Sequence, residues 1–124
     1  MVVPVPLHRR RFRQRGFNQA YLLVHHWPLF FQSHGAATEK PRILKQALMR
    51  CRSTPFQTGL GRRERLSNLK DAFALTPGTA VAGKSVLLVD DVMTTGTTVD
   101  ACAKVLVNAG ASRVDVLTLA RAMV

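Results

Sequence analysis

The clearest hydrophobic pattern lies in the second half of the chain. Residues 85–89, SVLLV, form an almost continuous apolar run that ends at the acidic pair Asp90 and Asp91. Such runs are typical of strands in parallel sheets that are covered on both faces. Apolar residues then recur at helical spacing from about Thr97 to Asn108, and Gly110 stands where a helix commonly ends. The pattern predicts a strand, a short loop and a helix.

Two further runs complete the expected sheet. Val114–Leu119 is largely apolar, and the order strand, helix, strand predicts a right-handed crossover between parallel strands. Near the N-terminus, Val2–Pro6 is extended, because a residue before proline avoids the helical region. We therefore expect an α/β fold, a parallel twisted sheet with helices on both faces, in a single domain over residues 1–124.

The segments between these strands are less regular. Asn18 is placed to cap a helix that begins near Gln19, and Pro28 should kink or stop that helix. Residues 42–51 fit a helix, although a short strand is also possible. The local composition predicts a strand at 72–75, a basic helix at 62–69, and loops at 8–16, 33–41, 53–61 and 76–84, of which 53–61 should be mobile.

The composition is that of a globular, cytoplasmic protein. Of 124 residues, 47% are apolar and 20% charged, which argues against disorder. Cys51 and Cys102 are too few for a zinc ribbon or a disulfide framework and are expected to be reduced thiols. The apolar stretch Ala20–Phe31 is shorter than the roughly 20 residues that a membrane span needs, so we expect no membrane partner.

The net charge of +11 is concentrated in the first half of the chain. Residues 1–70 carry 14 Lys and Arg against 2 Asp and Glu, whereas residues 71–124 are close to neutral. Such a basic half predicts an anionic partner, and nucleic acid, an acidic membrane surface or a phosphorylated small molecule would each satisfy it. Composition does not choose among the three.

The loop after the apolar run has the chemistry of a phosphate site. Thr94–Thr98 leads into the expected helix, whose first N–H groups are free to donate to an anion. Gly96 lets the backbone approach that anion closely, and the threonine hydroxyls add donors. Asp90 and Asp91 stand at the carboxyl end of the strand, where α/β proteins bind ligands. A phosphate cradle beside carboxylates suits a sugar phosphate, although adjacent strand residues should point to opposite faces.

Residues 86–98, VLLVDDVMTTGTT, resemble the phosphoribosyl-pyrophosphate signature of type I phosphoribosyltransferases. The resemblance implies a type I phosphoribosyltransferase-like core in which Asp90 and Asp91 hold the ribose hydroxyls and, indirectly, Mg²⁺. It also implies that the 5-phosphate is held by Thr94, Thr95, Gly96, Thr97 and Thr98. Purine-specific members usually carry an aspartate at the position of Thr94, so the threonine removes one expected catalytic base and argues against purine salvage.

Four further segments resemble the ComF/GntX family, which is phosphoribosyltransferase-like and linked to DNA uptake in competence. They are PVPLH at 4–8, RGFNQA at 15–20, RSTPFQTGL at 52–60, and Arg65 with Asn68. The resemblance implies that the diphosphate binds after the first strand, at His8, Arg15 and Gly16. It further implies that a flexible loop at about 52–61 closes over the site. Arg52, Arg63 and Arg65 are the cations expected to neutralise the departing diphosphate, with Arg52 and Arg65 as candidate catalytic residues. Members usually carry an N-terminal four-cysteine zinc module, which this chain is expected to lack, and the face left uncovered would favour a homodimer.

Two functions follow as hypotheses. In the first, the protein binds phosphoribosyl pyrophosphate and Mg²⁺ and transfers phosphoribose to an unknown acceptor. In the second, it is a non-catalytic basic module that associates with DNA or with competence proteins. A third possibility, an NTP-binding P-loop, is rejected. Residues 78–85, GTAVAGKS, match that motif, but they precede an expected strand, whereas a P-loop opens a helix.

Overall fold

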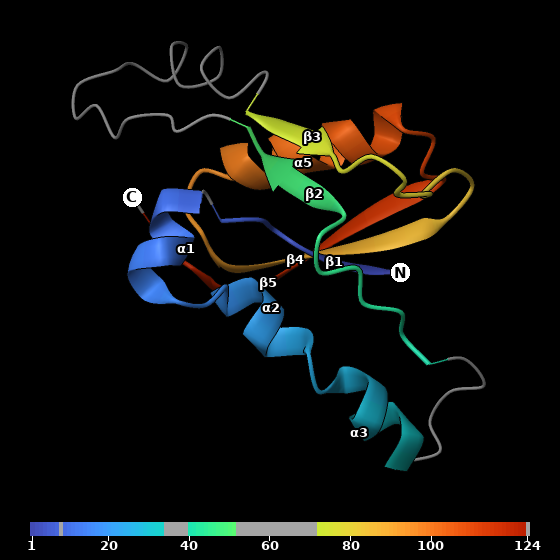
Figure 1. The fold of residues 1–124 in the computed structure, drawn as a ribbon, viewed down its shortest axis with the longest axis horizontal. Helices are drawn as coiled ribbons and strands as arrows, with labels where there is room; N and C mark the ends of the chain where they lie inside the picture. The colour runs from blue at the N-terminus through green and yellow to red at the C-terminus, as the bar shows by residue number, and fades with distance from the viewer. Residues whose placement is uncertain (8, 34–39, 52–71, 124) are drawn as a thin grey trace.

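A three-stranded parallel sheet organises the computed structural model, which describes residues 1–7, 9–33, 40–51 and 72–123 (Figure 1). The strands are β1 (Val2–Pro4), β4 (Ser85–Met93) and β5 (Arg113–Arg121). Their order is β1-β4-β5, so the most apolar segment of the chain forms the central strand. Both neighbours of β4 run parallel to it, with Val3 opposite Leu88 and Leu88 opposite Val116. The expected parallel sheet and its crossover are confirmed.

Helices cover both faces of this sheet because side chains alternate along β4. Val86 and Leu88 belong to the cluster under α5 (Thr97–Asn108), whereas Val89 packs on the opposite face with Val24 of α2 (Gln19–Val24). Figure 1 shows α5 and α2 on opposite sides of the sheet. Leu88 is fully buried, and burial of a leucine stabilises a fold by about 2 kcal/mol. The expected two-sided α/β architecture is confirmed.

A small hairpin lies on the α5 side of the sheet. It consists of β2 (Leu48–Arg50) and β3 (Phe73–Leu75), which pair antiparallel. Leu48 and Phe73 join the same core cluster as Cys102 of α5. The ambiguous segment 42–51 therefore contains a strand, and the expected strand at 72–75 is confirmed. Pairing between distant segments decides this outcome, because three-residue strands carry little local signal.

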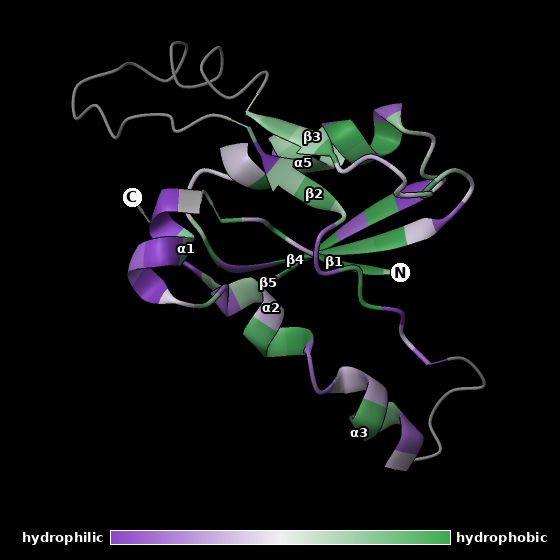
Figure 2. Cartoon of the chain, in the orientation of Figure 1, coloured by the Kyte–Doolittle hydropathy of each residue, from purple (hydrophilic) through white to green (hydrophobic). Residues whose placement is uncertain are grey.

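The expectation of a loop over residues 8–16 is wrong for most of that segment. Arg9–Arg15 forms helix α1, followed by Gly16, which has φ 75° and donates its N–H to the Phe12 carbonyl at 2.7 Å. Arginine and glutamine have high helix propensity, and no glycine or proline interrupts the segment. Figure 2 shows α1 as one of the most hydrophilic elements, in contrast to the green central strands. The hydrophilic composition suggested a loop, but it suits an exposed helix.

Asn18 caps α2 as expected. Its Oδ1 accepts the N–H of Tyr21 at 3.4 Å, and its Nδ2 donates to the Val5 carbonyl at 3.0 Å, which ties the helix start to the residue that follows β1. After α2 ends, Pro28 lies in the first turn of a separate helix, α3 (Trp27–Ser33), where the missing N–H is tolerated. The helix is thus stopped and restarted.

Other expectations divide between confirmed elements and residues outside the described ranges. Helix α5 has the expected bounds, and Gly110 follows it with φ 93°. The P-loop look-alike opens strand β4 at Ser85, in line with its rejection. The expected mobile loop at 53–61 and basic helix at 62–69 lie outside the described residues. Within the described ranges, every helix is too short or too polar to cross a membrane.

Candidate functional site

The candidate site is built where β4 gives way to α5. Strand β4 continues past its apolar core through Asp90 and Asp91, so the acidic pair lies within the strand. Its pairing with β5 runs from Ser85 to Asp90 and resumes at Val92. The bend at 94–96 follows, and α5 begins at Thr97. Both predicted parts of the site therefore meet at the carboxyl edge of the sheet, where α/β folds bind ligands.

The bend has the backbone that a phosphate cradle requires. Gly96 is the N-cap of α5 and has φ 80°, a conformation that residues with a Cβ rarely adopt. Around it the described structure is open, since the nearest atom to an added Cβ is Met93 Sδ at 3.6 Å. Among the described residues no side chain caps this helix start, so the first-turn N–H groups remain available to an anion.

Threonine side chains flank these N–H groups. Thr94 and Thr95 are exposed, Thr97 and Thr98 are half-buried, and the Thr95 and Thr97 hydroxyls lie 3.0 Å apart. One hydroxyl of that pair donates to the other, which leaves its partner's proton free for a ligand. The five predicted residues 94–98 thus form one continuous edge around the start of α5.

The two aspartates are held by the backbone that follows each of them. Asp90 Oδ1 accepts the Asp91 N–H at 2.9 Å, and Asp91 Oδ1 accepts the Val92 N–H at 2.9 Å. Burial raises the pKa of Asp90 to about 6, with a further contribution from the Asp91 side chain. Asp90 therefore gains or loses its charge near neutral pH, which is a common property of functional carboxylates.

The acidic pair fits an indirectly held Mg²⁺. No group of three His, Cys, Asp or Glu side chains that could hold a metal is found in the described parts of the chain. Mg²⁺, however, is often bound through one or two carboxylates, with substrate phosphates and water completing the octahedron. Each aspartate uses Oδ1 to accept a backbone N–H, and both residues are only half-buried.

The predicted diphosphate residues are only partly described. His8, Arg52 and Arg65 lie outside the described residues. Arg15 is exposed at the last position of α1, and Gly16 closes that helix. Their assignment to a diphosphate remains a prediction.

One half-buried basic residue, Arg50, was missed by the sequence analysis. Arg50 ends β2 with its guanidinium 5.4 Å from the centre of the Phe73 ring, and it is half-buried. Burial, and then the positive charge of Arg11, lowers the pKa of Arg50. The sequence contains one signal for Arg50, which is that it lies two residues after the apolar Leu48. In a strand, residues two apart lie on the same face, so Arg50 shares a face with Leu48 once the segment is known to be a strand.

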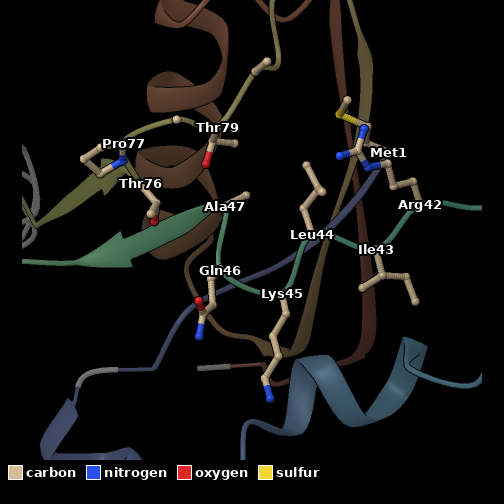
Figure 3. A pocket seen from close by; sticks show the side chains of 12 residues that line it. Met1, Arg42, Ile43, Leu44, Lys45, Gln46, Ala47, Thr76, Pro77 and Thr79 are labelled. Carbon is tan, nitrogen blue, oxygen red and sulfur yellow. The ribbon is translucent and has the colours of Figure 1, made fainter.

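A separate pocket opens at the other end of the sheet (Figure 3). It has a volume of about 520 Å³ and is lined by residues 1, 42–47 and 76–80. Met1 borders it and precedes β1, so the pocket lies at the amino end of the strands. It therefore plays no part in the site at Asp90 and Gly96.

Comparison with known proteins identifies the same family that residues 86–98 resemble. Residues 39–124 match the Phosphoribosyl transferase domain. The chain is 40% identical over 122 residues to DNA utilization protein YhgH of Escherichia coli O6:H1, covering 98% of this chain and 49% of the relative. It is 37% identical to Competence protein F of Haemophilus influenzae, covering 98% and 50%, and 30% identical to Competence protein ComFC of Bacillus subtilis, covering 98% and 44%.

The chain thus spans about half the length of the curated relatives it matches. No solved structure matches it significantly. The family match covers about two thirds of the chain and includes the acidic pair, the bend and α5. The chain therefore belongs to the phosphoribosyltransferase domain family, as a phosphoribosyltransferase-like protein of the ComF type.

Proposed function

We propose that the protein binds phosphoribosyl pyrophosphate together with Mg²⁺ and transfers the phosphoribosyl group to an acceptor, releasing diphosphate. The observation that carries this proposal is the acidic pair of β4 followed directly by the open N-terminus of α5 at Gly96. The family membership supports it independently. The names of the relatives connect them to DNA use and competence, and we extend that connection to this chain as part of the proposal.

Different residues bind different parts of the substrate. The N–H groups around Gly96 and the threonine hydroxyls of 94–98 receive the 5-phosphate. The carboxylates of Asp90 and Asp91 accept hydrogen bonds from the ribose hydroxyls. In the transfer the bond from ribose C1 to the diphosphate oxygen breaks, and the oxygen leaves with the electron pair. The acceptor attacks C1 from the opposite face, with inversion. Negative carboxylates nearby stabilise the positive charge that develops on the ring. Bound Mg²⁺ would neutralise charge on the diphosphate.

Binding is tested by calorimetry and thermal unfolding with phosphoribosyl pyrophosphate, with and without Mg²⁺. The parent protein should show heat of binding and a rise in Tm that needs Mg²⁺. The double variant Asp90→Asn with Asp91→Asn should lose both. Asp115→Asn is the matched control, because Asp115 is a half-exposed β5 carboxylate paired with Arg113. Absence of binding by the parent would contradict the proposal, and release of diphosphate in the presence of an acceptor would extend it to turnover.

A second candidate function is binding of single-stranded nucleic acid by α1. This helix contains arginines at 9, 10, 11, 13 and 15, and Phe12 within it and Phe17 after it are 44% and 45% exposed. Cations for phosphates next to exposed rings for base stacking are typical of single-strand binding surfaces. Fluorescence anisotropy with labelled single-stranded DNA should show an affinity that falls steeply with salt. Arg10→Gln with Arg13→Gln should flatten that dependence, and an unchanged slope would exclude this surface.

A further inference from the structure

The pocket at the amino end of the strands has the size and the charge of a small-molecule site. Its volume of about 520 Å³ lies within the range of roughly 300–1,000 Å³ that is typical of ligand pockets. None of the twelve described residues that line it is acidic, whereas Arg42 and Lys45 are cations. The proposed function makes no use of this pocket, because the acidic pair and the bend at Gly96 lie at the opposite end of the sheet.

The side chain of Arg42 faces the pocket because the backbone at 42–44 is extended beside β1. The Val2 N–H donates to the Arg42 carbonyl at 2.8 Å, and the Leu44 N–H donates to the Val2 carbonyl at 2.9 Å. Side chains alternate along such a segment. Ile43 packs in the cluster on the α2 face, whereas Leu44 packs in the cluster on the α5 face. Arg42 therefore shares the α5 face with Leu44, and Figure 3 shows both side chains pointing away from Ile43.

The guanidinium of Arg42 has no partner in the described structure. No ion pair or side-chain hydrogen bond joins it to another described residue. The Lys45 ammonium, by contrast, lies 4.5 Å from the centre of the Tyr21 ring on α2. A guanidinium offers a phosphate two parallel N–H donors. Arg42 thus provides an unused binding point for one anionic group.

The other side of the pocket adds hydroxyl groups. It is formed by the segment that follows β3, in which the Thr76 N–H donates to the Ala47 carbonyl at 2.9 Å and the Thr79 N–H donates to the Thr76 carbonyl at 3.1 Å. Figure 3 shows Thr76 and Thr79 on one side of Leu44 and the Arg42 guanidinium on the other. Leu44 and Ala47 supply apolar surface between these polar ends.

We propose that this pocket binds a nucleoside monophosphate. Its phosphate binds the Arg42 guanidinium, its ring lies against Leu44 and Ala47, and its far polar edge meets Thr79. One guanidinium matches one phosphate group, and the pocket is far larger than a phosphate, which leaves the apolar surface for a ring. A hydroxyl both donates and accepts, so it suits the mixed polar groups of a base or a ribose. The inference is independent of the proposed function, since the two sites share no residue.

The test follows backbone amide shifts in NMR spectra of the parent protein titrated with AMP, adenosine or inorganic phosphate. Gly78 lines the pocket and Gly96 begins α5, so their amides report the two sites separately. AMP should shift the Gly78 amide in a saturable way. Adenosine, which lacks the phosphate, and inorganic phosphate, which lacks the ring, should each bind at least about tenfold more weakly.

Substitutions then identify the groups that bind each part of AMP. Arg42→Gln should weaken AMP by about 10- to 100-fold and leave adenosine within about twofold, because only AMP presents a charge to the guanidinium. Arg42→Lys should recover part of the loss. Thr79→Val should weaken both ligands by about 2- to 10-fold, the loss of a neutral hydrogen bond. Lys84→Gln is the matched control, because it removes an exposed cation that directly precedes β4 and lies outside the lining.

Arg42 is exposed, and the same spectra show whether each variant is folded. A Gly78 amide that ignores AMP, or that responds equally in Arg42→Gln, would overturn the inference. Equal affinities for AMP and inorganic phosphate would exclude contact with the ring and overturn the ligand class. A response of Gly96 alone would place AMP at the bend and also contradict this site. Asp90→Asn with Asp91→Asn should lose phosphoribosyl pyrophosphate but keep the Gly78 response, so failure of either proposal is recognised separately.

Discussion

At the scale of single residues, the site uses conformations and charges that do not favour stability. Asp90 has a carboxylate whose pKa is raised to about 6, chiefly by burial, and Gly96 has φ 80°. A buried charge and an exposed helix start are both unfavourable without a ligand. Each can therefore be tested twice, once for its effect on the free protein and once for its effect on binding.

Asp90→Asn should stabilise the free protein at neutral pH. Between about pH 4 and 6 the folded parent holds a proton on Asp90 that the unfolded chain releases, so parent stability falls as pH rises through this window. Asparagine has no charge to bury and keeps an acceptor for the Asp91 N–H. At pH 7.5 we expect a gain on the order of 1 kcal/mol, after allowance for solvent screening, or a few degrees in Tm.

The measurement is thermal unfolding of parent and variant from pH 4 to 8 without ligand. The two Tm curves should converge near pH 4 and separate above it, whereas Asp115→Asn should follow the parent throughout. A variant less stable than the parent at pH 7.5 would show that Asp90 makes a stabilising interaction in its charged form.

Gly96→Ala should weaken binding more than it weakens the fold. A Cβ at φ 80° costs about 1–2 kcal/mol, although the space would accept it, with Met93 Sδ at 3.6 Å. Relief of that strain turns the bend away from its present geometry, so binding of phosphoribosyl pyrophosphate should fall at least about tenfold. Gly78→Ala is the matched control, since Gly78 has φ 84° and no described residue lies within 4 Å of an added Cβ. Equal affinities in calorimetry for the two variants would exclude a role for the bend.

At the scale of elements, local sequence predicted those parts whose structure is decided locally. The run 85–89, the bend at Gly96 and helix α5 are each specified by neighbouring residues, and all were recovered. Strand β2 remained ambiguous because only its pairing with β3 distinguishes it from a helix. Helix α1 was mistaken for a loop, because its arginines form no amphipathic pattern.

The same reasoning explains which site residues were found. The acidic pair and the bend lie within one motif, so their chemistry is visible in sequence. Arg50 was missed because its place against the Phe73 ring depends on the pairing of β2 with β3, which is distant in the sequence. The assignments at His8, Arg52 and Arg65 came from resemblance and lie outside the described residues. Long-range packing is the information that a single sequence does not expose.

Asn18 makes two hydrogen bonds, and two substitutions at this position measure their separate contributions to stability. Asn18→Ala removes both the cap on Tyr21 N–H and the bond to the Val5 carbonyl, which should lower the free energy of unfolding by about 1–2 kcal/mol. Asn18→Asp keeps the cap but places an oxygen against the Val5 carbonyl. Its stability should therefore lie between that of the parent and that of Asn18→Ala. Urea unfolding measures the series. An Asn18→Asp variant as stable as the parent would show that the hydrogen bond to the Val5 carbonyl contributes nothing.

At the scale of the whole molecule, one edge of the sheet, formed by β5, is weakly covered. Strand β5 pairs with β4 on one edge, and no described strand pairs with its other edge. Val116, Leu117 and Leu119 on this strand are 46%, 43% and 73% exposed. A long edge strand with exposed apolar side chains is prone to associate with another chain. The sequence analysis expected a homodimer, and this strand is the surface that would form it.

We predict that a second copy of the chain covers β5 at micromolar concentrations. An interface repeated by a two-fold axis would bring Leu119 of both copies out of water, and the gain grows with the apolar area removed. Leu119→Lys should shift sedimentation equilibrium toward the monomer by at least about tenfold in the dissociation constant, because a charge at a dry interface is unfavourable. Its stability should change by less than about 0.5 kcal/mol, since the side chain is exposed within one copy.

Met49→Lys is the matched control, as Met49 is an exposed apolar residue on β2. Association unaffected by Leu119→Lys, or a parent that stays monomeric, would exclude this surface.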